Sequence, residues 1–189
     1  MAPSSTDQDP GWKPVLRILP TLVIPFLGMR AMTMQNSGLQ ATRLLWLVFV
    51  NAMVVLWVPV VVLAATGGAP VSIPTGVVVT AAIGTTMILL APRFVPAIDA
   101  SSPTELARSF QRATLIRIGF AQGAAAGGFV LFLLTGSWIV YGTGFLVAAY
   151  GMWLAAPRTP RLEAIQNEIT AGGSDLDLIR VLNTTRLTR

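Results

Sequence analysis

Two long stretches of the chain contain no charged residue, and this feature limits the possible folds more than any other. The first stretch runs from Leu44 to Pro92 over 49 residues, and the second from Ile118 to Pro157 over 40 residues. A helix that spans a bilayer needs roughly 20 apolar residues, so each stretch has room for two spans and a short connection. The sequence therefore predicts an all-α polytopic membrane protein with four transmembrane helices arranged as two hairpins.

The composition agrees with a membrane protein. Hydrophobic residues make up 53% of the chain and charged residues 11%, whereas an average soluble domain is about 25% charged. These values exclude an ordinary soluble globular protein and an intrinsically disordered chain.

Turn and breaker residues divide each uncharged stretch into two spans. The first stretch is interrupted by Gly67, Gly68, Pro70 and Pro74, and the second by the tight turn 135–137. The predicted spans are residues 44–65, 75–92, 115–134 and 138–156. Residues 1–43 then form a cytoplasmic N-terminal region, 44–156 the transmembrane domain, and 157–189 a cytoplasmic helical tail.

The basic residues show on which side of the membrane each connection lies. All of the thirteen Lys and Arg residues precede the first span, lie between the second and third, or follow the fourth, and none lies in the turns at 66–74 and 135–137. The positive-inside rule therefore predicts a plasma (inner) membrane protein with both termini and the middle loop in the cytoplasm. Because these residues face anionic headgroups, the net charge of +5 does not indicate a nucleic-acid partner.

The segment 12–30 is apolar, but it is too short and too rich in proline to span. Its uncharged part, residues 18–29, is twelve residues long, and the segment contains three prolines. We expect it to lie in the membrane interface, with Lys13, Arg17 and Arg30 near lipid phosphates. Packing on its own helices and binding of a partner protein remain alternatives. Because residues 1–11 do not resemble a cleavable signal, we expect the first span to act as an uncleaved insertion signal.

The tail is predicted to contain two short helices. The apolar residues Leu162, Ile165 and Ile169 recur at helical spacing over 161–170, and Gly172 and Gly173 end this helix. Ser174 is the predicted N-cap of the second helix. Such short helices must lie on the membrane, on the middle loop or on another protein, because they cannot form a core alone. The middle loop contains a helix start at 102–105, and this helix is expected to continue into the third span.

The residues that most catalytic sites and metal sites require are missing. The chain has no histidine and no cysteine, which excludes Cys/His zinc sites, thiol catalysis and Ser/His triads. It also has no Walker A motif and no GxSxG motif. None of the predicted spans contains an ionisable residue deep in the membrane, which disfavours a proton- or ion-coupled transporter. We therefore predict a non-enzymatic protein with no cofactor.

Small residues recur every fourth position in the spans, a pattern that allows close helix packing. They are Gly76 and Gly84 in the second span and Gly119, Gly123 and Gly127 in the third. These glycines are candidates for packing within the chain or for docking on another membrane protein.

Polar side chains within or at the ends of the spans form a second group of candidates. Asn51 and Gln122 are deep polar residues that would bond within the chain, to a second protein or to a substrate. Arg117 is expected to reach the lipid headgroups, with an ion pair to a partner as the alternative. The aromatic residues near the span ends are predicted interface anchors, namely Trp46, Trp57, Trp138, Tyr141 and Trp153.

Three features of the chain resemble a known family. They are the Gly/Ala-rich third span, the sequence from Phe129 to Trp138 (FVLFLLTGSW) and the basic inner loops. In these features the chain resembles small four-helix actinobacterial membrane proteins. More narrowly, it is similar to the accessory subunit found with mycobacterial Mce lipid-import complexes. The resemblance implies binding beside the permease subunits of a lipid transporter, without an ATPase or a substrate tunnel in this chain.

Two functions are consistent with these features. The first is a non-catalytic accessory subunit that docks on a larger membrane complex and stabilises or regulates it. The second is a homo-oligomeric small transporter or pore built through the same glycine-rich faces. Stoichiometric co-purification with a larger protein distinguishes the first from the second.

Overall fold

A computed structural model describes residues 11–16, 37–64 and 71–184, and every regular element in these ranges is a helix. The helices are α1 (Lys13–Leu16), α3 (Gly38–Val55), α4 (Trp57–Ala64), α5 (Ile73–Phe94), α6 (Pro103–Thr135), α7 (Trp138–Ala155), α8 (Thr159–Ala171) and α9 (Leu178–Thr184). Four helical segments are long and apolar enough to cross a membrane, namely α3 with α4, α5, α6 and α7. The predicted all-α multi-pass fold is confirmed.

Local sequence signals determine both ends of α6. The Ser102 Oγ accepts a hydrogen bond from the Glu105 backbone N–H at 3.2 Å, so Ser102 caps the helix, and Pro103 follows at its first position. At the other end, Gly136 has a φ of +64°, a conformation that glycine adopts without steric cost. Its N–H bonds to the Phe132 carbonyl at 2.8 Å. The predicted helix start in the middle loop and the predicted tight turn are both confirmed.

The first span is interrupted at Leu56, between α3 and α4. Pro59 causes the interruption, because its ring lacks an N–H and clashes with the carbonyl of Val55, four residues earlier. The Tyr141 hydroxyl donates a hydrogen bond of 2.7 Å to the Met53 carbonyl beside the break. The prediction that Tyr141 is an interface anchor is wrong, since this side chain is fully buried against Val60 and Phe132.

The described helices belong to two compact units. The first, called here the terminal unit, comprises residues 1–48, 96–114 and 156–189. The second, called the span unit, comprises residues 49–95 and 115–155. Helices α3 and α6 contribute residues to both units.

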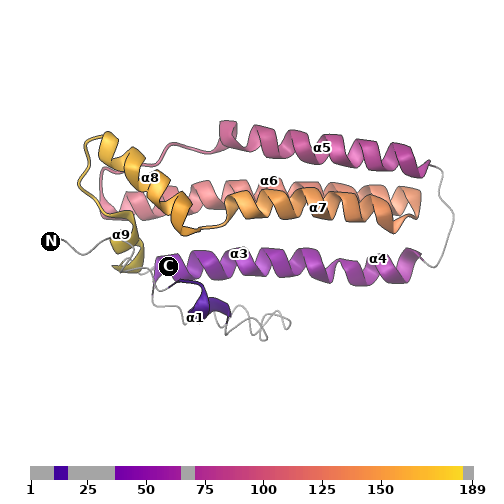
Figure 1. The fold of residues 1–189 in the computed structure, drawn as a ribbon, viewed down its shortest axis with the longest axis horizontal. Coiled ribbons are helices and arrows are strands. Elements are labelled where there is room, and N and C mark those ends of the chain that lie inside the picture. Colours follow the sequence, from indigo (N-terminus) through magenta and orange to yellow (C-terminus); the bar gives the residue numbers. More distant parts are fainter. Residues whose placement is uncertain (1–10, 17–36, 65–70, 185–189) are drawn as a thin grey trace. The chain divides into compact units, whose positions relative to one another are not determined.

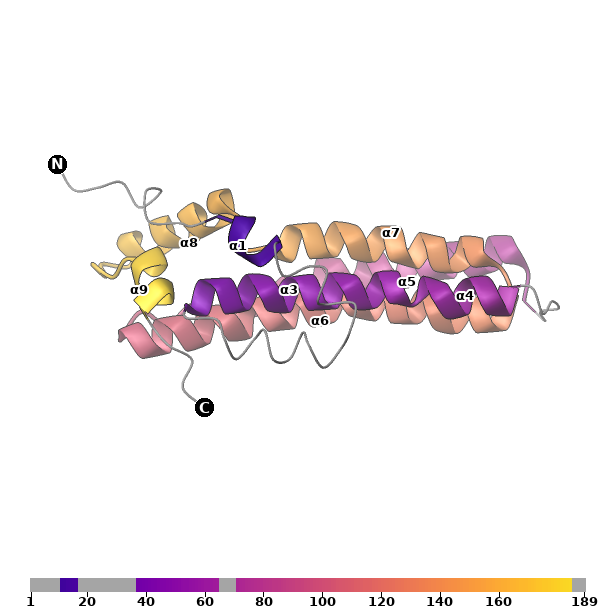
Figure 2. The same cartoon turned by 90° about the horizontal axis from the view of Figure 1, so that it is seen from below.

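In the span unit, α6 and α7 form the central pair. Figures 1 and 2 show α5 on one side of this pair and α4 on the other. The buried residues of α5 are Gly76, Thr80, Gly84 and Ala91, which lie along one face of the helix. The first two spans therefore lie on opposite sides of the α6–α7 hairpin, although they are consecutive in the sequence.

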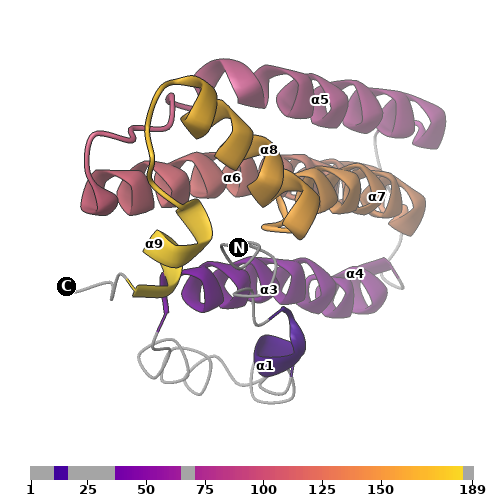
Figure 3. The same cartoon turned by 60° about the vertical axis from the view of Figure 1, so that its left-hand side comes forward.

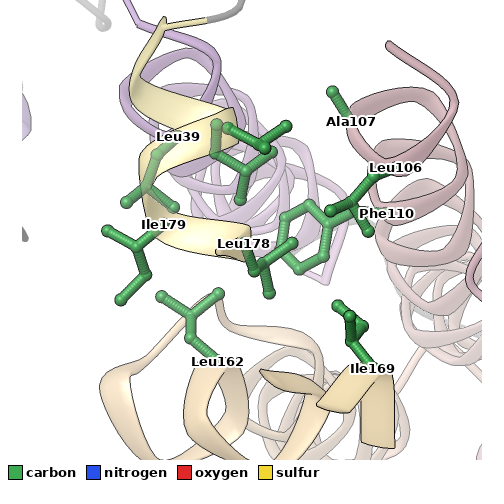
Figure 4. Close-up of a cluster of buried hydrophobic side chains, with 10 residues drawn as sticks. Leu39, Leu106, Ala107, Phe110, Leu162, Ile169, Leu178 and Ile179 are labelled. Atoms are coloured by element: carbon green, nitrogen blue, oxygen red, sulfur yellow. The ribbon is translucent and has the colours of Figure 1, made fainter. Parts of the chain in front are cut away.

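The terminal unit has a hydrophobic core of its own, to which four helices contribute. Helices α8 and α9 pack with the start of α6 (Figure 3), and Figure 4 shows Phe110 among the leucines and isoleucines of the other helices. The buried core residues are Leu39, Leu106, Ala107, Phe110, Leu162, Ile169, Leu178, Ile179, Val181 and Leu182. The sequence predicts that the tail lies on the membrane, on the middle loop or on another protein. The structure shows it packed on the part of α6 that belongs to the middle loop.

The predicted cap of the second tail helix is wrong. Helix α9 begins at Leu178, and its cap is Asp177, whose Oδ1 accepts a hydrogen bond from the Arg180 N–H at 3.0 Å. Ser174 lies in the preceding connection, where its Oγ accepts a bond from the Leu176 N–H at 3.4 Å. Both residues are typical caps, and the packing of the apolar residues 178–182 determines which of them begins the helix.

Candidate docking surfaces and a buried arginine

Helices α6 and α7 touch through their backbones at Gly128 and Gly144. A Cβ atom built on Gly144 would lie 2.8 Å from the Cα of Gly128, and a Cβ on Gly128 would lie 2.9 Å from the Cα of Gly144. Neither distance leaves room for a side chain. Both glycines are therefore required by the packing of the span unit itself.

The two glycines proposed for docking in α5 also serve the packing within the chain. A Cβ on Gly76 would lie 2.7 Å from Thr135 Cγ2, and a Cβ on Gly84 would lie 2.9 Å from Val147 Cγ1. Both glycines are buried. In the structure, Gly76 and Gly84 therefore dock α5 onto its own bundle.

The glycines of the third span behave differently. No atom of the described residues lies within 4 Å of a Cβ built on Gly119, and among these residues a Cβ on Gly127 would meet only Ile83 Cγ2 at 4.0 Å. At Gly123 the nearest atom is the Met87 Sδ at 2.7 Å, which is the flexible end of a side chain. The packing described here therefore does not require glycine at these positions, and it requires glycine least at Gly119 and Gly127.

These glycines lie on one side of α6, which we call the open face. Its residues recur at helical spacing and are exposed or half-buried: Gly119, Gly123, Ala126, Gly127 and Val130. A glycine inside a helix costs about 0.5–1 kcal/mol relative to alanine. On the open face nothing within the described chain offsets this cost at Gly119.

The two deep amide side chains are both engaged. The Gln122 Nε2 donates a hydrogen bond of 2.8 Å to the Phe49 carbonyl, so Gln122 links α6 to α3. Asn51 is half-buried in α3 and also takes part in an interaction. For Gln122, the structure agrees with the interpretation that its side chain forms a hydrogen bond between two helices of the same chain.

Arg43 is a completely buried charged residue that the sequence analysis did not single out. Its Nη1 donates to the Gly11 carbonyl at 2.7 Å, and its Nε and Nη2 lie 3.4 Å from the Pro157 carbonyl. The guanidinium carbon lies 5.3 Å from the ring centroid of Trp12, within range of a cation–π interaction. Arg43 therefore joins α3 to the segment at 11–12 and to the start of the tail.

We expect Arg43→Met to loosen residues 11–16 and to leave the carbonyls of Gly11 and Pro157 without this donor. Hydrogen bonds to a charged group contribute about 1.5–3 kcal/mol each, and the bonds to Pro157 are long, so we expect a loss of about 2 kcal/mol. Hydrogen exchange of residues 11–16 in the full chain measures the effect. The control is Arg112→Met, the same change at an exposed position, and an equal effect of both variants would contradict the role of Arg43.

Only part of the predicted headgroup-contact group is described. Lys13 is exposed in α1, whereas Arg17, Arg30 and most of the segment 12–30 lie outside the described residues. Arg117 is half-buried in α6, and its Nε is buried without a hydrogen-bond partner in the described part of the chain. The predicted lipid contacts of these residues stay predictions.

A search for metal ligands and comparisons with known proteins complete the description of the site. Within residues 11–16, 37–64 and 71–184, no group of three or more Asp and Glu residues is placed to hold a metal ion. A scan of the chain against protein-family models finds no match, and searches among curated proteins and solved structures find none either.

Proposed function

We propose that this chain is a non-catalytic accessory subunit that docks on a larger membrane complex through the open face of α6. One observation carries the proposal: among the described residues, a Cβ on Gly119 would meet no atom and a Cβ on Gly127 only Ile83 at 4.0 Å, whereas Gly128 and Gly144 touch within the chain. In lipid, small residues allow the backbones of two helices to approach closely, and such contacts replace the hydrophobic drive that soluble proteins use. A helix of a partner protein at the open face would account for glycine there.

The exposure of the spans supports the same proposal. In the most apolar windows of α3–α4 and α5, only 17% of residues are buried inside the chain, against 39% in α6 and in α7. Helices α6 and α7 thus form the centre of the bundle, yet the described helices leave a face of small residues on α6 uncovered. A face made for lipid alone gains nothing from glycine, because lipid chains pack against larger side chains equally well.

The partner that we propose is an Mce-type lipid transporter of the plasma membrane. The resemblance of residues 119–138 to the accessory subunit of such complexes supports this choice. In this role the chain lies beside the permease subunits, with both termini in the cytoplasm, and stabilises or regulates the assembly. The distribution of the Lys and Arg residues supports the orientation.

The test is co-purification of the chain with its partner. The protein is tagged at its C-terminus at native expression level, extracted in a mild detergent, and analysed by size and by mass spectrometry. We expect a larger membrane complex in fixed ratio. In the double variant Gly119→Leu/Gly127→Leu we expect the recovered partner to fall about tenfold or more, since each factor of ten corresponds to about 1.4 kcal/mol.

A matched variant separates docking from added bulk. Ala82→Leu/Thr86→Leu adds two leucines four residues apart on an exposed side of α5, and we expect it to retain the partner. Both double variants should keep the thermal stability of the isolated chain. Recovery of this chain alone, as a defined oligomer with flux in liposomes, would instead establish the homo-oligomeric pore.

A further inference from the structure

The span unit contains two arginines and no acidic residue. Arg93 lies in the last turn of α5, and Arg117 lies in α6. Residues 49–95 and 115–155, which make up the unit, contain no other charged residue. No carboxylate of the same unit can therefore neutralise these two positive charges.

Arg117 lies on the face of α6 that packs against the other helices of the span unit. Ala121 follows it by one turn, and its Cβ would lie 2.9 Å from a Cβ on Gly151 of α7. Ala124 follows by two turns, and its Cβ would lie 3.1 Å from a Cβ on Gly84 of α5. Residues three or four positions apart share a helix face. Arg117 therefore continues the stripe of α6 that faces α5 and α7, which run beside α6 in Figure 1.

The guanidinium of Arg117 is short of acceptors in this position. The side chain is half-buried, and its Nε is buried without a hydrogen-bond partner among the described residues. A buried donor of a charged group is costly unless an acceptor meets it. Arginine binds phosphate and carboxylate groups through two parallel N–H donors, so an anion at Arg117 would remove this cost.

Apolar side chains surround the two arginines. Phe94, which follows Arg93, stacks on Phe120, which lies three residues after Arg117, with the ring centroids 5.3 Å apart. Both arginines are thus neighbours in sequence of the same ring pair. Phe94 is 61% exposed, and Leu89, one turn before Arg93, is 71% exposed. This end of the span unit therefore offers positive charge and exposed apolar surface together.

We infer that Arg93 and Arg117 bind the phosphate group of one anionic phospholipid, whose acyl chains lie against Phe94 and Leu89. The position of the arginines favours a lipid over other anions. Arg93 directly follows the uncharged stretch 44–92, and Arg117 directly precedes the uncharged stretch 118–157. Both residues therefore lie at the depth of the headgroups, where basic pockets between membrane helices bind anionic lipids.

This lipid site is independent of the proposed docking face. Successive residues of an α-helix are rotated by about 100°. Arg117 is therefore about 200° from Gly119, on the opposite side of α6 from the open face. A lipid at Arg117 would leave the open face free for a partner.

The test compares two phospholipids with the same acyl chains. The full chain is purified in dodecyl maltoside and titrated with dioleoyl-phosphatidylglycerol or with dioleoyl-phosphatidylcholine, and native mass spectrometry counts the bound molecules. We expect one molecule of the anionic lipid to bind in a saturable way, with an affinity about tenfold higher than that of the zwitterionic lipid. Inorganic phosphate in large excess should not displace it, because free phosphate has no acyl chains.

Variants of α6 test the role of Arg117. Arg117→Met should weaken binding of the anionic lipid about tenfold. Arg112→Met makes the same change at an exposed position of the same helix, and it should change the affinity by less than about twofold. Arg117→Lys keeps the charge but loses the planar pair of donors, so we expect an intermediate loss of about threefold.

Thermal stability separates lipid binding from a structural role. In dodecyl maltoside with the zwitterionic lipid, Arg117→Met should melt no lower than the wild type, since it removes a buried donor that has no partner among the described residues. The anionic lipid should raise the melting temperature of the wild type and not that of Arg117→Met. If Arg117→Met melts lower without lipid, the affinity of Arg117→Lys decides between the two roles.

Four results would overturn the inference. They are equal affinities of the two phospholipids, equal effects of Arg117→Met and Arg112→Met, wild-type affinity in both Arg117 variants, and displacement of the lipid by inorganic phosphate. If the anionic lipid is not preferred and Arg117→Met instead lowers the amount of recovered partner protein, Arg117 pairs with a carboxylate of that partner. The proposed function is tested separately, because Gly119→Leu/Gly127→Leu should release the partner and retain the lipid.

Discussion

Gly144→Leu should lower the melting temperature of the purified chain by about 10 °C. Overpacking a filled interior costs about 1–3 kcal/mol and occasionally more, and a chain of this length loses about 2–4 °C per kcal/mol. The upper end of this range applies, because a Cβ on Gly144 would already lie 2.8 Å from the Gly128 backbone and 3.0 Å from the Ala124 carbonyl oxygen. Backbone atoms of a helix cannot rotate away as a side chain can, so α6 and α7 must separate.

The matched control for this prediction is Gly119→Leu. It introduces the same side chain into the same bundle, at a position where no atom of the residues that the structure describes lies within 4 Å of the new Cβ. We expect its melting temperature to stay within about 2 °C of the wild type, as is usual for exposed substitutions. Equal losses in the two variants would mean that α6 and α7 do not meet at Gly128 and Gly144.

Phe110→Ala should release the tail from the core of the terminal unit. Phe110 is 1% exposed and lies among the leucines and isoleucines of α8 and α9 (Figure 4). Replacing a buried phenylalanine by alanine costs about 3–5 kcal/mol, through lost burial and the cavity that remains. The population with an open tail should rise about a hundredfold or more, because each 1.4 kcal/mol is a factor of ten.

Trypsin cleavage after Arg161 in α8 and Arg180 in α9 measures this release in the full chain. Cleavage in helices follows the open population when opening and closing are fast. Phe94→Ala is the control, since Phe94 is 61% exposed and lies in the span unit, and it should leave the cleavage rates unchanged. A Phe110→Ala variant cleaved at the wild-type rate would show that the tail does not depend on this core.

The open face of α6 offers close approach of backbones inside the membrane, where association depends on fit.

Much of the fold could be read from the sequence, because the decisive signals are one-dimensional. The uncharged stretches indicated the number of spans. The predicted limits agree with the observed helices to within two residues, except that α3 and α6 begin earlier than predicted. Ser102 and Gly136 marked a helix start and a turn through interactions with residues three or four positions away. Such local interactions depend only on neighbouring residues, so the sequence contains them in full.

The candidate site could be predicted only in outline. The glycine pattern identified close packing, but Gly84 and Gly119 look alike in the sequence, and only the structure distinguishes buried Gly84 from exposed Gly119. Arg43 resembled the other basic residues that flank a span, yet it is buried and bound to carbonyls far away in the chain. Asp177 rather than Ser174 caps α9, because burial of the residues that follow outweighs the local preference.

The sequence by itself therefore determined that this chain is helical, that it has four apolar helices able to span a membrane, and where each of them ends to within two residues. Only the tertiary structure decided which faces of these helices meet, which glycines remain open, and where the tail helices pack. The physical reason is the helical period of 3.6 residues. A repeat of small residues every fourth position marks one stripe along a helix, but the rotation of that stripe toward its neighbours depends on the packing of all the helices together.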